Sequence, residues 1–404
     1  MRKNFGKGKR DFDFFLKRTR YFLDLVGSPD KDMKYVHVTG TAGKGTVSTM
    51  MEEVLSASGK KVGMYTSPFV TTPIDKIKAN GKYISPASLV RLTEYLKPFM
   101  KKAESGPYGA PSAFELFFAL ALLYFKEEKC QWAVLEVGLG GRYDATNVIK
   151  KPEAALITTI DYDHTEILGK TLREIAYDKA GIIKKNCHFF TAEQRPALLK
   201  LFKKICKEQD ASFEAIGKQK DHTQYNEALV ARAAEFLGIK EKDIKKGIEH
   251  TRMPCRFEIV QKDPLVILDG AHNRAKIRST IATLKNYSYK KLFVILALAE
   301  TNRDHQAVLS ELVPKADCVI ATQMRGTNRR SVYAGKILAE MKRYSTKKNS
   351  LEMIEDPYEA LSKTLKKAGK NDLVLVTGSF FLAGELRKKW YSEEWVLTHR
   401  KSFN

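Results

Sequence analysis

An alternation of short apolar runs with helical patterns, which begins at Tyr35, constrains the fold more than any other feature of the chain. Such alternation is typical of βα units that build a mostly parallel sheet. A first set of expected strands comprises Tyr35–Thr39, Val62–Tyr65, Trp132–Glu136, Ala154–Ile160 and Cys187–Thr191. A second set comprises Leu265–Leu268, Leu292–Ala297, Cys318–Ala321 and Leu373–Thr377. The sequence therefore predicts an α/β protein with two mostly parallel sheets.

The chain length supports a division into two domains. With 404 residues, the chain is too long for a single compact core. The helical patterns of Asn226–Leu237 and Lys240–His250 are followed by a proline and a loss of periodicity at residues 251–254. We therefore place the boundary near Pro254. This predicts a first domain over residues 1–254 and a smaller, Rossmann-like α/β domain over residues 255–404.

Composition restricts the class of protein and of partner. Lys and Arg number 70 against 47 Asp and Glu, and the net charge of +23 favours anionic partners. The five cysteines form no CxxC pair, which argues against a disulfide framework and a zinc finger. The longest apolar stretch, Ala113–Phe125, is shorter than the roughly 20 residues of a membrane span. We expect a soluble, cytoplasmic protein without a membrane partner.

A glycine-rich turn, GTAGKGT at residues 40–46, lies between the first expected strand and a helical pattern over Val47–Ser58. Glycines let backbone amides turn inward, the helix N-terminus contributes partial positive charge, and Lys44 contributes a full one. The spacing departs from the usual P-loop, because two residues rather than four separate the outer glycines. A tight strand-to-helix connection would explain the glycines alone. The lysine and the flanking elements favour a cradle for a nucleoside triphosphate in a P-loop-type ATPase domain.

A second glycine-rich turn, Gly138–Arg142, follows the strand that ends at Glu136. It does not fit the dinucleotide fingerprint G-x-G-x-x-G, because Tyr143 occupies the position of the third glycine. We therefore exclude a nicotinamide enzyme. Glu136 is polar at the end of an apolar strand, and a carboxylate beside bound phosphates requires a cation, for which Mg2+ is the natural choice.

Further polar clusters follow other expected strands. DYDH at residues 161–164 follows the fourth strand, DGAHN at residues 269–273 follows the first strand of the second set, and Lys179 lies in the helical stretch Thr171–Ile183. A lone histidine is most often structural, and a lone lysine is usually solvated. Because ligands bind at the carboxyl ends of parallel strands, the recurrence of this placement favours a functional role.

Seven segments of the chain together form a recognisable pattern: HVTGTAGKGT, YTSPF, LEVGLGGRYDATNVI, DYDHTEILGKTLREIAYDKAGIIK, CRFE, LDGAHN and VTGSF, spread between Tyr35 and Leu386. In content and order they resemble the folylpolyglutamate synthase and dihydrofolate synthase family, within the Mur ligase superfamily. The resemblance implies a ligase of folate metabolism that uses ATP to activate a carboxylate as an acyl phosphate. The amino group of L-glutamate then attacks it. Folate or dihydropteroate would be the other substrate.

The resemblance also implies roles for individual residues. Nucleotide binding is implied for Gly43, Lys44, Gly45, Thr46, Asn226, Arg256, Asp269 and His272. Coordination of Mg2+, at two sites, is implied for Ser67, Glu136, His164 and Lys179, and Lys179 matches a lysine that the family carbamylates. Lys44, His164 and Lys179 are the expected catalytic residues. These roles suit a phosphoryl transfer, which depends on positioning and on charge neutralisation.

The sequence also departs from the family pattern. Ala42 replaces an asparagine of the loop, Cys255 stands where glycine often precedes the arginine of RFE, and Arg274 replaces the proline that usually follows GAHN. Residues 70–77 (VTTPIDKI) keep the length and the acidic–basic pair of the family's RFNERI loop but not its letters. That loop approaches the folate side. We expect catalysis to be retained and the departures to act on pterin specificity.

Three other functions agree with part of the sequence. A Mur-type ligase acting on a UDP-linked muropeptide precursor would share the ATP site, but GGRYDATN and DKAGIIK resemble the folate branch more closely. A basic nucleic-acid-binding protein would use the net charge, yet no nucleic-acid motif is recognisable. A non-catalytic ATP-binding regulator would not require Lys44, Glu136, His164 and Lys179 together. We therefore expect a glutamate ligase that acts as a monomer, without a nucleic-acid partner.

Overall fold

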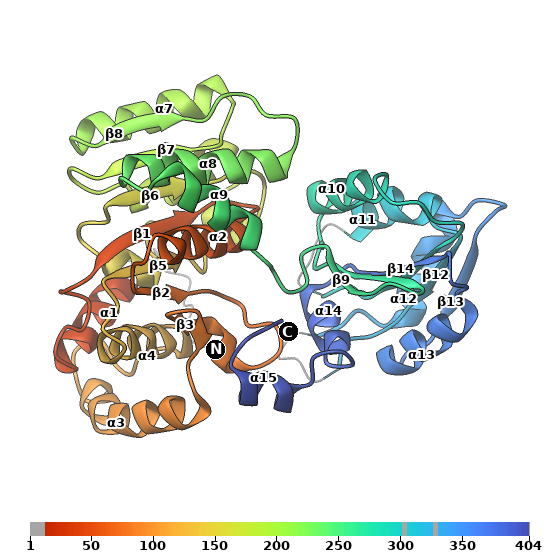
Figure 1. Cartoon of the computed structure of the whole chain (residues 1–404), viewed down its shortest axis with the longest axis horizontal. Coiled ribbons are helices and arrows are strands. Elements are labelled where there is room, and N and C mark those ends of the chain that lie inside the picture. The colour runs from red at the N-terminus through yellow and green to blue at the C-terminus, as the bar shows by residue number, and fades with distance from the viewer. Residues whose placement is uncertain (1–12, 301–304, 326–329, 404) are drawn as a thin grey trace. The chain divides into compact units, whose positions relative to one another are not determined.

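The computed structural model describes residues 13–300, 305–325 and 330–403, which form two compact units (Figure 1). The first unit contains the described residues up to Phe69 together with Ile74–Thr251. The second contains Val70–Pro73 and the described residues from Arg252 onward. The sequence-based boundary near Pro254 lies close to this division, whereas the placement of Val70–Pro73 with the second unit has no counterpart in the sequence analysis.

The first unit is an eight-stranded sheet, in the order β4-β3-β2-β5-β1-β6-β7-β8, with helices on both faces. The strands β2, β5, β1, β6, β7 and β8 run parallel, and β3 and β4 extend the sheet as an antiparallel edge. Its elements are α1 Asp13–Leu25, β1 Lys34–Thr39, α2 Lys44–Ala57, β2 Val62–Tyr65, η1 Pro73–Lys76, β3 Ile77–Ala79, β4 Lys82–Tyr83, α3 Pro86–Glu104, α4 Ala113–Glu127, β5 Trp132–Glu136, η2 Ala145–Val148, β6 Ala154–Ile157, α5 Thr165–Leu168, α6 Leu172–Lys179, η3 Ala180–Ile182, β7 His188–Thr191, α7 Pro196–Glu208, β8 Ser212–Ala215, α8 His222–Phe236 and α9 Glu241–His250.

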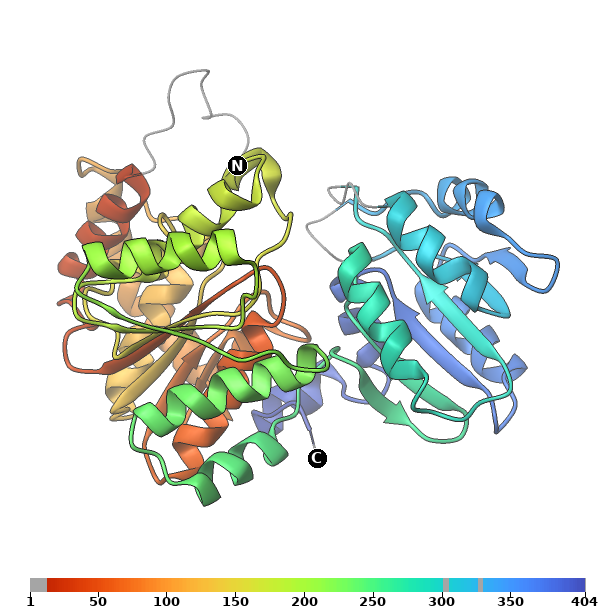
Figure 2. The ribbon, with the colours of Figure 1, turned by 90° about the horizontal axis from the view of Figure 1, so that it is seen from above.

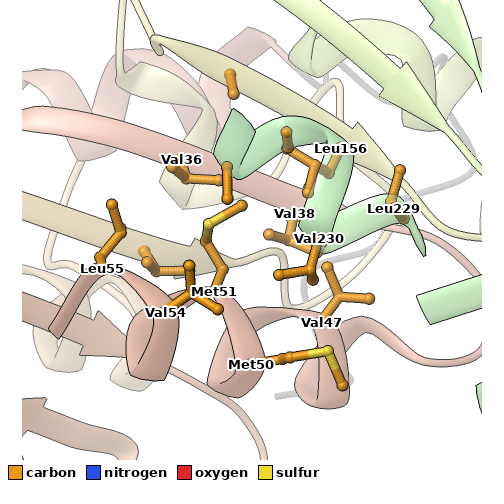
Figure 3. Close-up of a cluster of buried hydrophobic side chains, with 14 of the residues drawn as sticks. Val36, Val38, Val47, Met50, Met51, Val54, Leu55, Leu156, Leu229 and Val230 are labelled. Carbon is orange, nitrogen blue, oxygen red and sulfur yellow. The ribbon is translucent and has the colours of Figure 1, made fainter. Parts of the chain in front are cut away.

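Alternate residues of the central strands face the two helical layers, as the period of a strand requires. On one face, Val36 and Val38 of β1 pack against Met51 and Val54 of α2 and against Leu229 of α8 (Figure 3). On the other face, residues of β6 and β7 pack against α6 and α7. Figure 2 shows α8 and α9 (green) on one side of this sheet and α7 (yellow-green) on the other. Both faces are therefore buried, which explains the nearly continuous apolar strands.

The second unit is a smaller sheet of six strands, in the order β13-β12-β11-β14-β10-β9, of which β9 is antiparallel. Apolar residues of α10, α11 and α12 cover one face, and those of α13 and α14 cover the other. Its elements are β9 Glu258–Gln261, β10 Leu265–Leu268, α10 Arg274–Leu284, β11 Leu292–Leu296, α11 His305–Leu312, η4 Val313–Lys315, β12 Cys318–Ala321, α12 Ala334–Met341, η5 Lys342–Tyr344, β13 Ser350–Met353, α13 Pro357–Lys367, β14 Leu373–Thr377, α14 Phe380–Arg387 and α15 Glu393–His399.

The expected fold class, an α/β protein with two mostly parallel sheets, is confirmed. Every expected strand is present, although β6 ends at Ile157 instead of Ile160, because the chain turns there toward the loop after β1. The helix after the first glycine-rich turn begins at Lys44 instead of Val47, so Lys44 stands at the helix N-terminus. Within the described ranges, no helix combines the length and the apolar character that a membrane crossing requires.

Candidate functional site

Four neighbouring strands of the first unit end at the same edge of the sheet. The strands β2, β5, β1 and β6 are parallel, with Tyr65 opposite Leu135, and Val38 opposite Glu136. The segments that follow them therefore lie next to one another: Ser67 after β2, Glu136 at the end of β5, residues 40–46 after β1 and residues 158–164 after β6. The fold thus brings together the polar clusters of the first half of the sequence.

The glycine-rich loop after β1 is held against the segment that follows β6. The Thr41 N–H donates to the Thr159 carbonyl (2.8 Å), and the Thr158 hydroxyl donates to the Ala42 carbonyl (2.5 Å). Gly40 has a φ of 147°, and a Cβ atom at this position would lie 1.8 Å from Oγ1 of Thr158. A side chain at residue 40 would therefore separate the two segments.

Gly43 connects this loop to α2 and lies against α8. Its φ is 84°, and a Cβ atom there would lie 2.8 Å from Oδ1 of Asn226. Two residues expected to bind the nucleotide, Gly43 and Asn226, are therefore neighbours. Gly43 is the N-cap of α2 and offers no side-chain cap to the amides of the first turn. Such amides, with the partial positive charge of the helix end, suit a phosphate group.

Lys44 and Lys179 direct their ammonium groups to the same backbone oxygen. Nζ of Lys44 lies 3.0 Å, and Nζ of Lys179 lies 2.9 Å, from the carbonyl oxygen of Gly40. Lys179, the last residue of α6, is only 2% exposed. Burial, assisted by the charge of Lys44, lowers the pKa of Lys179 from the ordinary 10.5 to about 7, although Asp163 and Asp178 oppose this shift. A large share of the Lys179 side chain is therefore uncharged at neutral pH.

The second glycine-rich turn allows α6 to approach closely enough to place Lys179. A Cβ atom at Gly141 would lie 2.6 Å from the Lys179 carbonyl oxygen, and one at Gly140 would lie 2.2 Å from Oδ1 of Asp178. The Arg142 N–H also donates to the Asp178 carbonyl (2.8 Å). The glycines of this turn thus serve close packing, a role that the sequence pattern did not reveal.

Ser67 and Glu136, two of the expected metal ligands, are in contact. The Ser67 N–H donates to Oε2 of Glu136 (3.1 Å), and Glu136 is buried. In the described part of the chain, no three His, Cys, Asp or Glu side chains cluster closely enough to hold a metal by themselves. Mg2+ that accompanies ATP usually takes one or two carboxylates from the protein and completes its shell with phosphate and water oxygens. The pairing of Glu136 with a serine, beside the glycine-rich loop after β1, fits that type of site.

His164, the third expected ligand, stands at the N-terminus of α5. It is exposed and has a φ of 48°, which is unusual for a residue other than glycine. Its ring lies 3.7 Å from a carboxylate oxygen of Asp163 and 3.8 Å from one of Glu166. The imidazole thus lies in an acidic environment at the end of β6.

Arg256, in the second unit, lies between two residues in the left-handed region, since φ is 54° for Cys255 and 48° for Phe257. Each flanking amide is held by a buried carboxylate: Cys255 N–H donates to Glu258 (2.8 Å), and Phe257 N–H donates to Asp269 (2.8 Å). Glycine adopts such a φ at the lowest cost. The departure at Cys255 therefore places a side chain where the backbone favours glycine.

Asp269 and His272 organise the loop after β10. The Asp269 carboxylate also accepts the N–H of Ala271 (2.9 Å) and the hydroxyl of Thr280 (2.9 Å). Nδ1 of His272 lies 2.8 Å from the Gly270 carbonyl, which can only accept, so Nδ1 carries the proton. Nε2 of His272 then accepts from Lys276 (3.0 Å). Asp269 thus has protein donors on both oxygens, and His272 is held in one tautomer.

The segment that departs from the family's RFNERI loop is divided between the units. Val70 packs in the apolar core of the second unit, and Thr71 accepts a hydrogen bond from Arg387 (3.4 Å). Lys76 belongs to the first unit, where its ammonium lies 4.3 Å from the centroid of the Phe117 ring. Burial lowers the pKa of Lys76. The acidic–basic pair of this loop thus includes a lysine enclosed by aromatic rings.

Several residues that shape the first unit's strand ends were missed by the sequence analysis. Thr158, Glu193 and Arg195 hold the loops after β1 and β6 but belong to none of the recognisable motifs. The available signal was their position, because Thr158 follows β6 directly and Glu193 and Arg195 lie two and four residues after the end of β7. Their partners are main-chain atoms of distant segments, which a sequence pattern does not identify.

Comparisons with known proteins cover nearly the whole chain. The family model of the Mur ligase middle domain matches residues 38–259, and that of the Mur ligase glutamate ligase domain matches residues 255–380. The dihydrofolate synthase/folylpolyglutamate synthase of Bacillus subtilis (strain 168) is 30% identical over 413 residues, which cover 93% of this chain and 94% of the relative.

Two solved structures of similar proteins contain nucleotides. The folylpolyglutamate synthase of Mycobacterium tuberculosis, complexed with ADP and AMPPCP, has a TM-score of 0.85 and 26% identity, and the match covers 93% of this chain and 95% of that one. The bifunctional folylpolyglutamate synthase/dihydrofolate synthase of Yersinia pestis, complexed with AMPPNP and a Mn ion, has a TM-score of 0.78 and 25% identity, with 93% of each chain covered.

Proposed function

The chain belongs to the folylpolyglutamate synthase/dihydrofolate synthase family of Mur ligases, and we propose that it joins L-glutamate to a folate or to dihydropteroate at the expense of ATP. The observation that carries this proposal is the pair Lys44 and Lys179 on one carbonyl, next to the uncapped N-terminus of α2. The charged side chain of Lys44 and a helix N-terminus at one strand edge suit the phosphates of ATP, and the buried amine of Lys179 lies beside them.

The reaction requires two displacements. The carboxylate of the folate or dihydropteroate attacks the terminal phosphorus of ATP, and ADP leaves. The amino group of L-glutamate then attacks the acyl phosphate, and inorganic phosphate leaves as the amide forms. Lys44 and the amides after Gly43 would neutralise the phosphate charge during the first step. Asn226 lies beside Gly43 and would bind the nucleotide there. Arg256, Asp269 and His272 are proposed nucleotide ligands within the second unit.

Ser67, Glu136 and His164 are the proposed ligands of the Mg2+ ions. When bound, such an ion would screen the charge of the phosphate oxygens and orient them. Glu136 suits this role because it is a buried carboxylate at the strand end nearest the loop after β1, and the Ser67 N–H holds it in place. The relative from Yersinia pestis is complexed with Mn, which supports a divalent cation here.

Lys179 is proposed to be carbamylated. Its lowered pKa leaves an uncharged amine at neutral pH, and only an uncharged amine can attack CO2. Attack of the uncharged amine on CO2 forms an N–C bond, breaks one C–O π bond, releases one proton to solvent and leaves one negative charge on the new carboxylate. The new carboxylate would attract a second Mg2+ ion. It would also pair with the ammonium of Lys44, which shares the Gly40 carbonyl with Lys179.

The net charge of +23 fits substrates that are strongly anionic, such as ATP and a polyglutamylated folate. A basic surface attracts such ligands, and the effect decreases with ionic strength. The KM for a long-chain folate should therefore rise with salt. A KM that stays constant from low to high salt would contradict this steering.

The direct test is phosphate release from ATP in the presence of L-glutamate and either a tetrahydrofolate or dihydropteroate, with each component omitted in turn. Turnover that requires every component, with a product heavier by one glutamyl unit, would establish the ligase. The accepted pterin would distinguish folylpolyglutamate synthase from dihydrofolate synthase activity. ATP binding without turnover on either pterin would contradict the proposal and would direct attention to residues 70–77.

A further inference from the structure

Two residues that follow β7, Glu193 and Arg195, form a fork-shaped ion pair beside the loop after β6. Nε of Arg195 lies 2.7 Å from Oε1 of Glu193, and a terminal nitrogen lies 2.7 Å from Oε2. The Glu193 side chain is 3% exposed, whereas that of Arg195 is 40% exposed. A bidentate pair of this kind holds both groups in one orientation.

The pair holds the peptide units of Ile160 from both sides. The Ile160 N–H donates to Oε2 of Glu193 (3.0 Å), and the guanidinium of Arg195 donates to the Ile160 carbonyl. The loop after β6 is also held from the side of β1, by Thr41. The Thr41 hydroxyl accepts a hydrogen bond from the Asp161 N–H (2.9 Å) and donates one to the Asp161 carbonyl (3.0 Å). The loop after β6 is thus fixed by the strand ends on its two sides.

This loop leads directly to His164, whose φ of 48° is costly for a residue other than glycine. Such a conformation persists when the surrounding contacts determine it, and the contacts described above hold Ile160 and Asp161, which precede His164 by four and three residues. We propose that Glu193 and Arg195 are positioning residues, which hold the loop so that His164 can serve the divalent cation bound with the nucleotide. The inference rests on the proposed function, because it takes His164 as a cation ligand.

The test uses Arg195→Met, because the half-exposed arginine can be removed without opening the core. Arg195→Lys keeps the positive charge but cannot form the bidentate pair. In Glu193→Gln, the NH2 group of the new amide faces the backbone N–H groups that donate to the carboxylate in the wild type, so a donor meets donors. The matched control is Arg20→Met. Arg20 forms a similar bidentate pair with Asp30 (2.7 and 3.0 Å), before the start of β1, at the other end of the strands.

Binding of Mn2+ to the whole protein with saturating ADP is followed by electron paramagnetic resonance, and hydrogen exchange is followed in peptides that cover residues 158–168. Arg195→Met should weaken Mn2+ binding by about tenfold, as loss of a group that orients a metal ligand does. Exchange at residues 158–168 should accelerate. Glu193→Gln should do the same, Arg195→Lys should be intermediate, and Arg20→Met should change neither. Binding of ADP without metal should stay unchanged in every variant.

Two results would overturn the inference. One is unchanged Mn2+ affinity in both Arg195→Met and Glu193→Gln, and the other is an equal loss in Arg20→Met, which would indicate a general loss of stability. Absence of Mn2+ binding to the wild-type protein with ADP would instead contradict the proposed function. The wild-type titration therefore separates the two failures.

Discussion

Lys179 in the first unit and Arg387 in the second are both buried cations, yet their surroundings are opposite. Arg387 is fully buried, and its Nε lies 2.9 and 2.8 Å from the two oxygens of Glu258. Lys179 donates to the neutral carbonyl of Gly40, which Lys44 also contacts. Arg387 is thus paired with a carboxylate, whereas Lys179 lies beside a second basic side chain, that of Lys44.

The difference separates a structural role from a chemical one. Arg387 also donates to the Ser402 carbonyl and to Thr71, so the matched charge joins the segment 70–73, the strand β9 and the C-terminal residues. Lys179 stabilises little in its charged form, because burial and Lys44 both oppose the charge. A buried cation without a carboxylate partner tends to lose its proton, and this makes its amine available for chemistry.

The largest expected effect is on catalysis. Lys179→Ala should lower kcat by about a hundred- to a thousandfold, because it removes the group proposed to carry the carbamate. Nucleotide binding and the fold should be retained. A short carboxylate such as acetate or formate, added to the assay, should restore part of the activity by occupying the vacated space.

The matched control for this change is Lys184→Ala. Lys184 is also partly buried in the same part of the chain, and burial also lowers its pKa, but no catalytic role is proposed for it. Lys184→Ala should leave kcat nearly unchanged and should not respond to acetate. Full activity of Lys179→Ala without acetate would contradict a chemical role for Lys179 and thus the contrast with Arg387.

Arg387→Met should have the largest effect on stability. Glu258 would remain buried opposite a side chain without charge, so the free energy of unfolding should fall by about 3–5 kcal/mol in urea titrations. The double variant Arg387→Met/Glu258→Leu should recover part of this loss. Recovery should be incomplete, because Glu258 also accepts the N–H of Cys255. A loss below about 1 kcal/mol in the single variant would argue against a structural role for this ion pair.

Lys179→Met should have the opposite effect on stability, with a distinct pH dependence. The folded protein releases the Lys179 proton near pH 7, whereas an unfolded chain retains it until about pH 10.5, so the wild type gains stability as the pH rises across this window. The variant should therefore be more stable than the wild type by about 2–4 kcal/mol below pH 7, and the difference should shrink toward pH 10.5. Unfolding in urea at pH 6, 8 and 10 measures this. A difference independent of pH would contradict the lowered pKa.

Thr71→Val should have the smallest effect. It removes the long hydrogen bond from Arg387 (3.4 Å) and keeps the side-chain shape, so the free energy of unfolding should fall by about 0.5 kcal/mol. Combined with Arg387→Met, the change should cost less than it does alone, because this donor is already absent. Full additivity in this double-mutant cycle would show that Thr71 does not depend on Arg387.

The strands and the order of elements were predictable because they follow from local patterns. The apolar runs at Val62–Tyr65, Trp132–Glu136 and Leu373–Thr377 match β2, β5 and β14 residue for residue. The strands β8, β9 and β13 and the antiparallel pair β3 and β4 were not predicted. These strands are short and only partly apolar, so their pairing depends on neighbours distant in the chain.

The candidate site was predictable in its residue types and only partly in its geometry. Sequence motifs identified Lys44, Glu136, His164 and Lys179, but the shared contact of Lys44 and Lys179 with Gly40 follows from the packing of α6 on the glycines of the second turn. The same applies to Glu193 and Arg195, whose partners are main-chain atoms of Ile160. Contacts of this kind leave no spacing pattern.

By itself, the sequence determined the fold class, the two glycine-rich turns and the family, because periodicity, composition and motif letters are local properties of a chain. The tertiary structure decided which polar residues meet, which glycines allow close packing, and which of the buried basic side chains is matched by a carboxylate. The physical reason is that desolvation and hydrogen bonding act between segments far apart in the chain. Lys179 differs from any other lysine of the sequence only through the segments that enclose it.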